Sequence, residues 1–166
     1  MKIIPEQLKI HSTPIALKAC AFTGHREIGE DLTRDSVKTA IENLIKKGVK
    51  TFYNGAAKGF DLLSAECVLE LKNTYPDLKL VLCIPYYGQE KAYLEEDKER
   101  YKTLTENCDE KILLSERYYK GCLQMRNRYM CDRSDALIAY LKKNTGGTAY
   151  TVKYFQKNRK GEIVFL

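Results

Sequence analysis

The sequence contains no tryptophan, only two histidines and no long apolar segment. A transmembrane helix needs about 18 or more consecutive apolar residues, and no such run occurs. The first residues also lack the apolar stretch and small-residue cleavage site of a secretory signal peptide. These absences predict a cytoplasmic protein that has no membrane partner.

Disulfide and metal-binding patterns are missing as well. The six cysteines include no C-x-x-C pair, and His11 and His25 are not spaced to complete a zinc site. Cys20 and Cys83 lie in apolar segments, where a thiol acts as a small hydrophobic side chain. We therefore expect reduced, mostly buried thiols and no bound metal.

Neither sign of charge is concentrated in one part of the chain. The 28 basic and 22 acidic side chains give a formal charge of +6, and segments such as EEDKERYK (95–102) mix both signs. A nucleic-acid-binding surface usually has a concentrated basic face, so this pattern disfavours a nucleic-acid partner. The mild positive balance is compatible with an anionic small ligand.

Six short apolar segments alternate with stretches of helical periodicity. In the first such stretch, Val37, Ala40, Ile41 and Leu44 recur at the spacing of one buried helix face. This alternation predicts a single α/β domain of Rossmann-like architecture over residues 18–166, a mostly parallel sheet with helices on both faces. Residues 1–17 precede the alternation and are expected to form an N-terminal extension or an edge element. The predicted strands are 19–22, 51–54, 78–85, 110–115, 135–140 and 162–166.

Glycines, tyrosines and polar residues follow the predicted strands. Ligands of open parallel sheets bind beyond the carboxyl ends of the strands, so the loops after the first five strands should share one site. These loops begin with Thr23-Gly24-His25-Arg26, NGAAKGFD (54–61), PYYGQE (85–90), SERYYKGCLQMRNR (115–128) and YLKKNTGGTAYT (140–151).

The last of these loops is the best phosphate candidate. Gly146 and Gly147 allow close approach of the backbone to a ligand, and Thr148 adds a hydroxyl at the start of a helix. A plain loop with a threonine N-cap is the alternative. In NGAAKGFD, Gly55 and Gly59 flank a tight turn, and neither a G-x-G-x-x-G nor a Walker A spacing is present.

Three other side chains are candidates for ligand contacts. Asp61 either caps its helix or accepts hydrogen bonds from ribose hydroxyls. Arg126 lies on an otherwise apolar helix face and therefore needs a phosphate or a carboxylate such as Asp61 or Asp135. His25 either contacts a sugar or phosphate or stabilises its turn. Tyr86 and its neighbour Tyr87, with Tyr118 and Tyr119, offer a flat face for a base or pack at the rim.

Five segments of the sequence together resemble the YpsA-like domain-of-unknown-function family. They are CAFTGHR, NGAAKGFDLLSAECVLELKNTYPDLKL, IPYYGQEKAYLEEDKERY, LSERYYKGCLQMRNRYMCDRSDALIAY and GGTAYTVKY. That family lies within the SLOG superfamily, with the Lonely Guy phosphoribohydrolases and the DNA-processing protein DprA. The resemblance implies a Rossmann-like fold and a pocket for a nucleotide or a nucleotide-derived molecule such as ADP-ribose. Relatives in the superfamily often pair, which implies a homodimer.

The enzymes of the superfamily use a helix arginine and a glutamate after their glycine loop. QMRNR is similar to the arginine motif and assigns that role to Arg126, whereas the glutamate position is Thr151. Asp61 and Glu90 are the acids that would have to replace this glutamate, and with Arg126 they are the catalytic candidates.

We therefore expect a protein that binds a nucleoside monophosphate or an ADP-ribose- or NAD-like molecule, with no other cofactor. The alternatives are a nucleotide N-glycosidase of the Lonely Guy type and a DNA-associated protein of the DprA type. The expected ligand-binding residues are Thr23, Gly24, His25, Arg26, Gly55, Gly59, Asp61, Tyr86, Arg126, Asn127, Gly146, Gly147 and Thr148.

Overall fold

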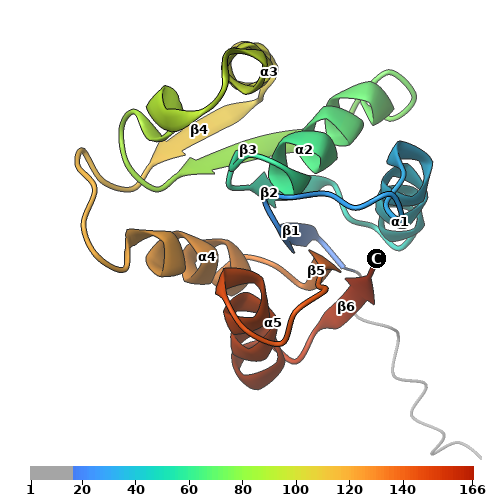
Figure 1. Ribbon diagram of the computed structural model, residues 1–166. Coiled ribbons are helices and arrows are strands. Elements are labelled where there is room, and N and C mark those ends of the chain that lie inside the picture. Colours follow the sequence, from blue (N-terminus) through green and yellow to red (C-terminus); the bar gives the residue numbers. More distant parts are fainter. Residues whose placement is uncertain (1–16) are drawn as a thin grey trace, which may run out of the picture.

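The computed structural model describes residues 17–166, which form a six-stranded sheet covered by helices on both faces (Figure 1). The strand order is β4-β3-β2-β1-β5-β6, and every neighbouring pair is parallel. The predicted Rossmann-like α/β fold is confirmed. The strands are β1 Ala19–Gly24, β2 Thr51–Asn54, β3 Lys79–Ile84, β4 Glu110–Leu113, β5 Ala136–Tyr140 and β6 Glu162–Phe165.

Five α-helices and one short 3₁₀ helix of the described chain connect these strands. Helices α1 to α3 cover one face of the sheet, and α4 and α5 cover the other (Figure 1). The helices are α1 Arg34–Lys46, α2 Phe60–Leu71, η2 Gln89–Ala92, α3 Glu95–Asn107, α4 Cys122–Asp132 and α5 Gly147–Asn158.

Alternating side chains of the central strands build two separate cores. In β1, Cys20 and Phe22 pack under α1 to α3, while Ala21 packs under α4 and α5. Successive side chains of a strand point to opposite faces, so a strand covered on both sides must be apolar throughout. This explains why the predicted central strands are continuous apolar segments.

The order of the strands creates a crevice beside β1. The chain runs outward from β1 through β2 and β3 to β4, then returns across the other face to place β5 on the opposite side of β1. Gly24 at the end of β1 pairs with Tyr140 at the end of β5, so the two following loops start side by side. The loops diverge to opposite faces of the sheet and leave a crevice between them. Ligands usually bind in this crevice in proteins of this architecture.

The helices begin in two different ways. Thr33 caps α1 through a capping box with Ser36. Helices α2, α4 and α5 instead have glycine N-caps, namely Gly59, Gly121 and Gly146, which provide no capping side chain. At α2 and α4 the first N–H groups are used within the protein, since Phe60 N–H donates to the His25 carbonyl and Cys122 N–H to the Tyr119 carbonyl. At α5 no hydrogen bond of the described chain uses the N–H groups of Gly147 and Thr148, which remain available to other partners.

Other expectations from the sequence can be compared with the described chain. All six cysteines are free, and all except the half-buried Cys108 are buried. No helix within residues 17–166 has both the length and the apolar character needed to cross a membrane. The proposed extension, 1–17, lies outside the described residues apart from Leu17, which packs against the core.

Candidate functional site

A cavity of about 330 Å³ lies at the carboxyl ends of the central strands, where the expected loops meet. Most of the expected ligand-binding residues line it, namely Thr23, Gly24, His25, Arg26, Asp61, Arg126, Asn127, Gly147 and Thr148. The remaining lining residues are Phe22, Ala57, Leu123 and Gln124. A cavity therefore lies at the edge of the sheet where the sequence predicts a site.

The amino-terminal end of α5 forms one wall of this cavity. Gly146 is the N-cap with φ of 92°, and Gly147 and Thr148 are the first residues of the helix. The alternative of a threonine N-cap is wrong, because Thr148 lies inside the first turn. A Cβ atom built at Gly146 or Gly147 would meet no other atom within 4 Å. The backbone is therefore approachable here, and helix amino termini favour anions.

Arg126 lies behind the cavity and is only 5% exposed. Its Nη1 donates to the carbonyl oxygens of Gly55 at 2.7 Å and Cys83 at 3.4 Å, and its Nε donates to Asn127 Oδ1 at 2.9 Å. Carbonyl and amide oxygens thus hold the guanidinium in place, but they do not neutralise its charge.

The structural salt bridge proposed for Arg126 is wrong within residues 17–166, where this side chain has no carboxylate within 4.0 Å. Asp135 instead accepts hydrogen bonds from the backbone N–H groups of Lys18 and Ala19. A buried charge without a counterion is costly, and an anionic ligand would supply one. Nη2 of Arg126 has no hydrogen-bond partner in the described chain and remains a donor for such a ligand.

Asp61 brings a carboxylate into the same cavity. It lies in the first turn of α2, is 7% exposed, and accepts a hydrogen bond from the N–H of Ala57 at 3.3 Å. Burial raises the pKa of this carboxyl from 3.8 to about 6, although Arg126 and Arg26 pull it downward. The predicted role as a helix cap is wrong, because Gly59 is the N-cap of α2 and the Asp61 carboxylate instead braces the preceding turn at Ala57. The side chain also lines the cavity, and contact with ribose hydroxyls stays a prediction.

His25 joins the loops that follow β1 and β5. Its Nε2 accepts a hydrogen bond from the backbone N–H of Lys142 at 2.8 Å, so the proton of the neutral ring is on Nδ1. Its ring packs edge-on to Tyr140. Burial and the nearby charges of Lys143 and Lys142 lower the pKa of His25. The turn-stabilising role is present, and the ring also lines the cavity.

Several expected glycines serve the protein's own packing. A Cβ on Gly24 would approach the Phe60 ring to 2.3 Å, and one on Gly55 would approach Arg126 Nη1 to 2.3 Å. Gly59 has φ of 82°, and a Cβ there would lie 2.2 Å from the backbone oxygen of Arg26. Gly55 and Gly59 do not line the main cavity and act by holding its walls.

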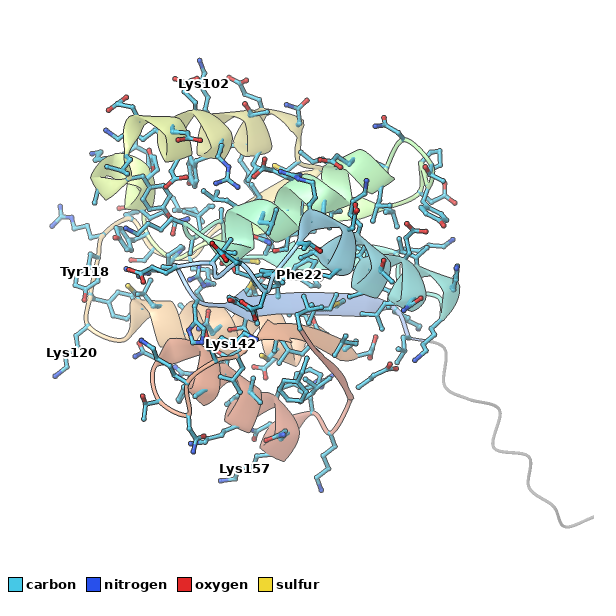
Figure 2. All side chains as sticks on the ribbon, turned by 45° about the vertical axis from the view of Figure 1, so that its right-hand side comes forward. Phe22, Lys102, Tyr118, Lys120, Lys142 and Lys157 are labelled. Atoms are coloured by element: carbon cyan, nitrogen blue, oxygen red, sulfur yellow. The ribbon has the colours of Figure 1, made fainter. Side chains whose placement is uncertain are left out.

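Two other candidates fall outside the main cavity. Tyr86 lines a smaller adjoining cavity and packs edge-on against Tyr118 at 5.3 Å between ring centroids. Glu90 lies in η2 and lines neither cavity. The other tyrosines proposed to contact a base, Tyr87, Tyr118 and Tyr119, are all exposed. Figure 2 shows Tyr118 pointing outward from the loop before α4.

Sequence reasoning missed some residues that shape the site. Gln89 Nε2 donates to the Gly55 carbonyl at 3.1 Å, and Tyr93 Oη donates to the Ala56 carbonyl at 3.0 Å. Both bonds join residues more than thirty positions apart. No local pattern marks such contacts. Gln124, by contrast, lies within the QMRNR motif, and that motif was a usable signal.

Comparison with protein families gives one match over nearly the whole described chain. The family model described as the YspA SLOG family, YpsA, matches residues 21–164. UPF0398 protein YpsA of Bacillus subtilis (strain 168) is 30% identical over 157 residues, which cover 87% of each chain. A UPF0398 protein of Bacillus velezensis is 31% identical over 157 residues, covering 87% of this chain and 86% of the relative.

Solved structures give the same fold at lower identity. DNA processing protein A (DprA) from Streptococcus pneumoniae is similar with a TM-score of 0.64 and 18% identity, over 89% of this chain and 50% of that protein. DNA processing protein A from Helicobacter pylori, described for its single-stranded DNA binding mode, has a TM-score of 0.61 and 18% identity, over 89% and 64%. The chain thus spans half to two thirds of these neighbours, and the likeness shows the fold alone.

Proposed function

The chain belongs to the YspA SLOG family, and from this premise we propose that its main cavity binds a nucleotide or a nucleotide-derived molecule. The phosphate would lie at the amino terminus of α5, against the backbone of Gly147 and Thr148. Arg126 would pair with the same anion. The family assignment confirms the resemblance found in the sequence, and the ligand is our inference from the cavity.

One observation carries the proposal: a buried guanidinium without a carboxylate partner and an approachable helix amino terminus line the same cavity of the described chain. The helix end alone favours an anion by only about 0.3–1 kcal/mol. A charge-assisted hydrogen bond from Arg126 adds roughly 1.5–3 kcal/mol. Together with backbone N–H donors, these contributions favour a phosphate over a neutral ligand.

Asp61 supports the choice of a nucleotide over inorganic phosphate. A carboxylate repels a phosphate but accepts hydrogen bonds from ribose hydroxyls or from the amino group of a base. The cavity therefore has a cationic wall at α5 and Arg126 and an accepting group at Asp61. A ligand with a phosphate at one end and hydroxyl or amino groups at the other satisfies both.

Thermal unfolding with AMP, NAD and ADP-ribose tests the proposal. A ligand present at 100 times its Kd should stabilise the folded protein by about 2.7 kcal/mol. Arg126→Gln should abolish the shift, while Arg128→Gln, which removes a nearby charge from the same helix, should retain it. A panel that produces no shift, or a shift that survives Arg126→Gln, would contradict the proposed site.

N-glycosidic hydrolysis is the enzymatic candidate, and Asp61 is its strongest residue. Among the described residues that line the main cavity and its smaller neighbour, Asp61 alone carries a carboxylate. Thr151 cannot replace a carboxylate; its hydroxyl donates to the Gly147 carbonyl and accepts from Asn127. Release of free base from AMP, measured by chromatography, tests this candidate; Asp61→Asn should stop the release but leave binding.

Single-stranded DNA is the third candidate, which the sequence disfavoured. Tyr87 and Tyr118 are 70% and 64% exposed beside the site, and exposed aromatic rings can stack on bases. Figure 2 shows Lys120 extending from the same loop as Tyr118. The fold neighbour from Helicobacter pylori is described for single-stranded DNA binding. Salt-sensitive gel retardation of a labelled oligonucleotide, reduced by Tyr118→Ala, would support this role.

The cytoplasmic location and the homodimer remain predictions. All six thiols are free, which supports a reducing compartment. Fractionation of cells that express the protein tests the compartment, and sedimentation equilibrium tests the oligomeric state.

A further inference from the structure

A second cavity, of about 120 Å³, adjoins the main one. The two share the lining residues Arg26, Ala57, Leu123 and Arg126. The volume is well below the roughly 300 Å³ of a site that encloses a whole small ligand. It therefore suits one additional group of a molecule already held in the main cavity. The other lining residues are Lys58, Tyr86, Gln89, Ala92 and Tyr93.

The charge around this second cavity is of one sign. Arg26, Lys58 and Arg126 line it, and no carboxylate of the described chain does. None of the three forms an ion pair with any residue between 17 and 166. Many other cations are paired, for example Arg100 with Glu66. Clustered like charges repel one another, and an anion between them removes that repulsion.

Arg126 connects the two cavities because it lines both. Its Nη1 and Nε are occupied by Gly55, Cys83 and Asn127, while Nη2 has no partner within residues 17–166. No fully buried side-chain nitrogen or oxygen of residues 17–166 lacks a hydrogen-bond partner, so the unpartnered Nη2 of this 5% exposed guanidinium is accessible and can donate to a group in the cavities.

The remaining polar groups of the second cavity serve its wall. Gln89 donates to the Gly55 carbonyl and Tyr93 donates to the Ala56 carbonyl, so these side chains fix the backbone that faces the cavity. The side chains of this cavity that remain free to bind a ligand are therefore mostly cationic. The Asp61 carboxylate of the main cavity interacts with Arg126 and Arg26, but it is one negative charge near three positive ones, and an uncharged sugar or base would add none.

We propose that the second cavity binds a second anionic group of the same ligand, and that the preferred ligand carries two phosphate groups. This inference rests on the proposed function, because it assumes that the first phosphate lies at α5. The two phosphates would flank Arg126, with Arg26 and Lys58 beside the second. A nucleoside monophosphate would fill only the main cavity.

Isothermal titration calorimetry with AMP, ADP, ADP-ribose and adenosine 3′,5′-bisphosphate tests the proposal. At least one of the two-phosphate ligands should bind tenfold or more tightly than AMP. Lys58→Ala is the decisive variant, because Lys58 is exposed and lines only the second cavity. It should weaken the best two-phosphate ligand about fivefold and change AMP binding less than twofold.

Lys157→Ala is the matched control, since it also removes one exposed lysine charge. Lys157 lies in the last turn of α5, at the opposite end of that helix from Gly147 (Figure 2). It should leave the affinity of every ligand within twofold. An equal loss of affinity in both variants would show that the effect comes from the overall charge of the protein, and it would overturn the second site.

The failures of the two proposals are distinguishable. If AMP binds as tightly as every two-phosphate ligand and Lys58→Ala changes neither, the second anion site is overturned while the proposed function stands. If none of the four ligands binds, the proposed function fails and this inference fails with it.

Discussion

The turn before α2 and the turn before α5 look alike but are filled differently. Each has a glycine N-cap in the left-handed half of backbone space, Gly59 with φ of 82° and Gly146 with φ of 92°. The space beside Gly59 is occupied by the backbone of Arg26, whereas nothing of the described chain lies within 4 Å of a Cβ at Gly146.

This difference separates a structural glycine from one that leaves room for a ligand. At Gly59 the missing side chain is explained by contacts inside the protein. At Gly147 neither a positive φ nor a neighbouring atom of the described chain requires glycine. What remains is access to the amino terminus of α5, which a ligand would use.

The largest expected effect on stability comes from filling the turn before α2, which is closed because the Arg26 backbone occupies the space beside Gly59. Gly59→Ala places a Cβ against the Arg26 backbone and forces an unfavourable φ, so we expect a loss of about 3 kcal/mol in the free energy of unfolding. Urea unfolding measures it. A loss below about 1 kcal/mol would show that this turn also has room and would remove the contrast with α5.

Asp61, which braces the closed turn, gives the next largest effect. Its pKa is raised to about 6, so the folded state holds this proton more tightly than the unfolded state does. Its contribution to stability is therefore present at low pH and is lost as the pH rises from about 4 through 6.

We expect the stability of the wild type relative to Asp61→Asn to fall by about 2 kcal/mol over that range. Urea unfolding at a series of pH values measures the difference. Parallel pH profiles of the two proteins would show that the Asp61 carboxyl does not titrate differently on folding.

The turn before α5 is open, because nothing of the described chain lies beside a Cβ at Gly146 or Gly147. Filling it should lower the affinity for the ligand without lowering the stability of the fold. Gly147→Ala should leave stability unchanged or raise it by up to about 1 kcal/mol, because alanine is the better helix residue. The affinity for the nucleotide that gives the largest thermal shift should fall about tenfold, or about 1.4 kcal/mol. Calorimetric titration beside urea unfolding separates the two effects, and unchanged affinity would count against a phosphate at α5.

His25, which braces the loop of the open turn, gives the smallest effect. Its pKa is lowered, so its contribution is present above its ordinary pKa of 6.5 and is lost as the pH falls below that value. His25→Gln should cost less than about 1 kcal/mol at a pH of about 7.5, since one partly exposed hydrogen bond to Lys142 is lost. A wild-type stability that rises as the pH falls through this range, relative to the variant, would contradict this assignment.

The fold was predictable because its signal is local. Apolar segments alternate with helical periodicity, and the helix face of Val37, Ala40, Ile41 and Leu44 is buried as the spacing predicts. Parallel strands place their carboxyl ends at one edge of the sheet, so the sequence also predicted that the loops after them lie together there. The order of the strands was not predictable, since it depends on which strands pair across the whole sheet.

The position of the cavity was predictable in outline, and its contacts were less so. The sequence showed that Arg126 needs an acceptor, but the acceptors are the carbonyl oxygens of Gly55 and Cys83, and every residue has a carbonyl. It also showed glycines at 55 and 59 without showing that Arg126 and Arg26 fill the space beside them. Such distinctions depend on packing between distant segments.

The main cavity draws its walls from both helical layers and from widely separated parts of the chain. Thr23 and Asp61 belong to the first half of the sequence, and Arg126 and Thr148 belong to the second. A molecule bound there would have to leave before the two layers separate. Ligand binding should therefore slow unfolding more than it speeds folding, so that protection from proteases would report occupancy of the site.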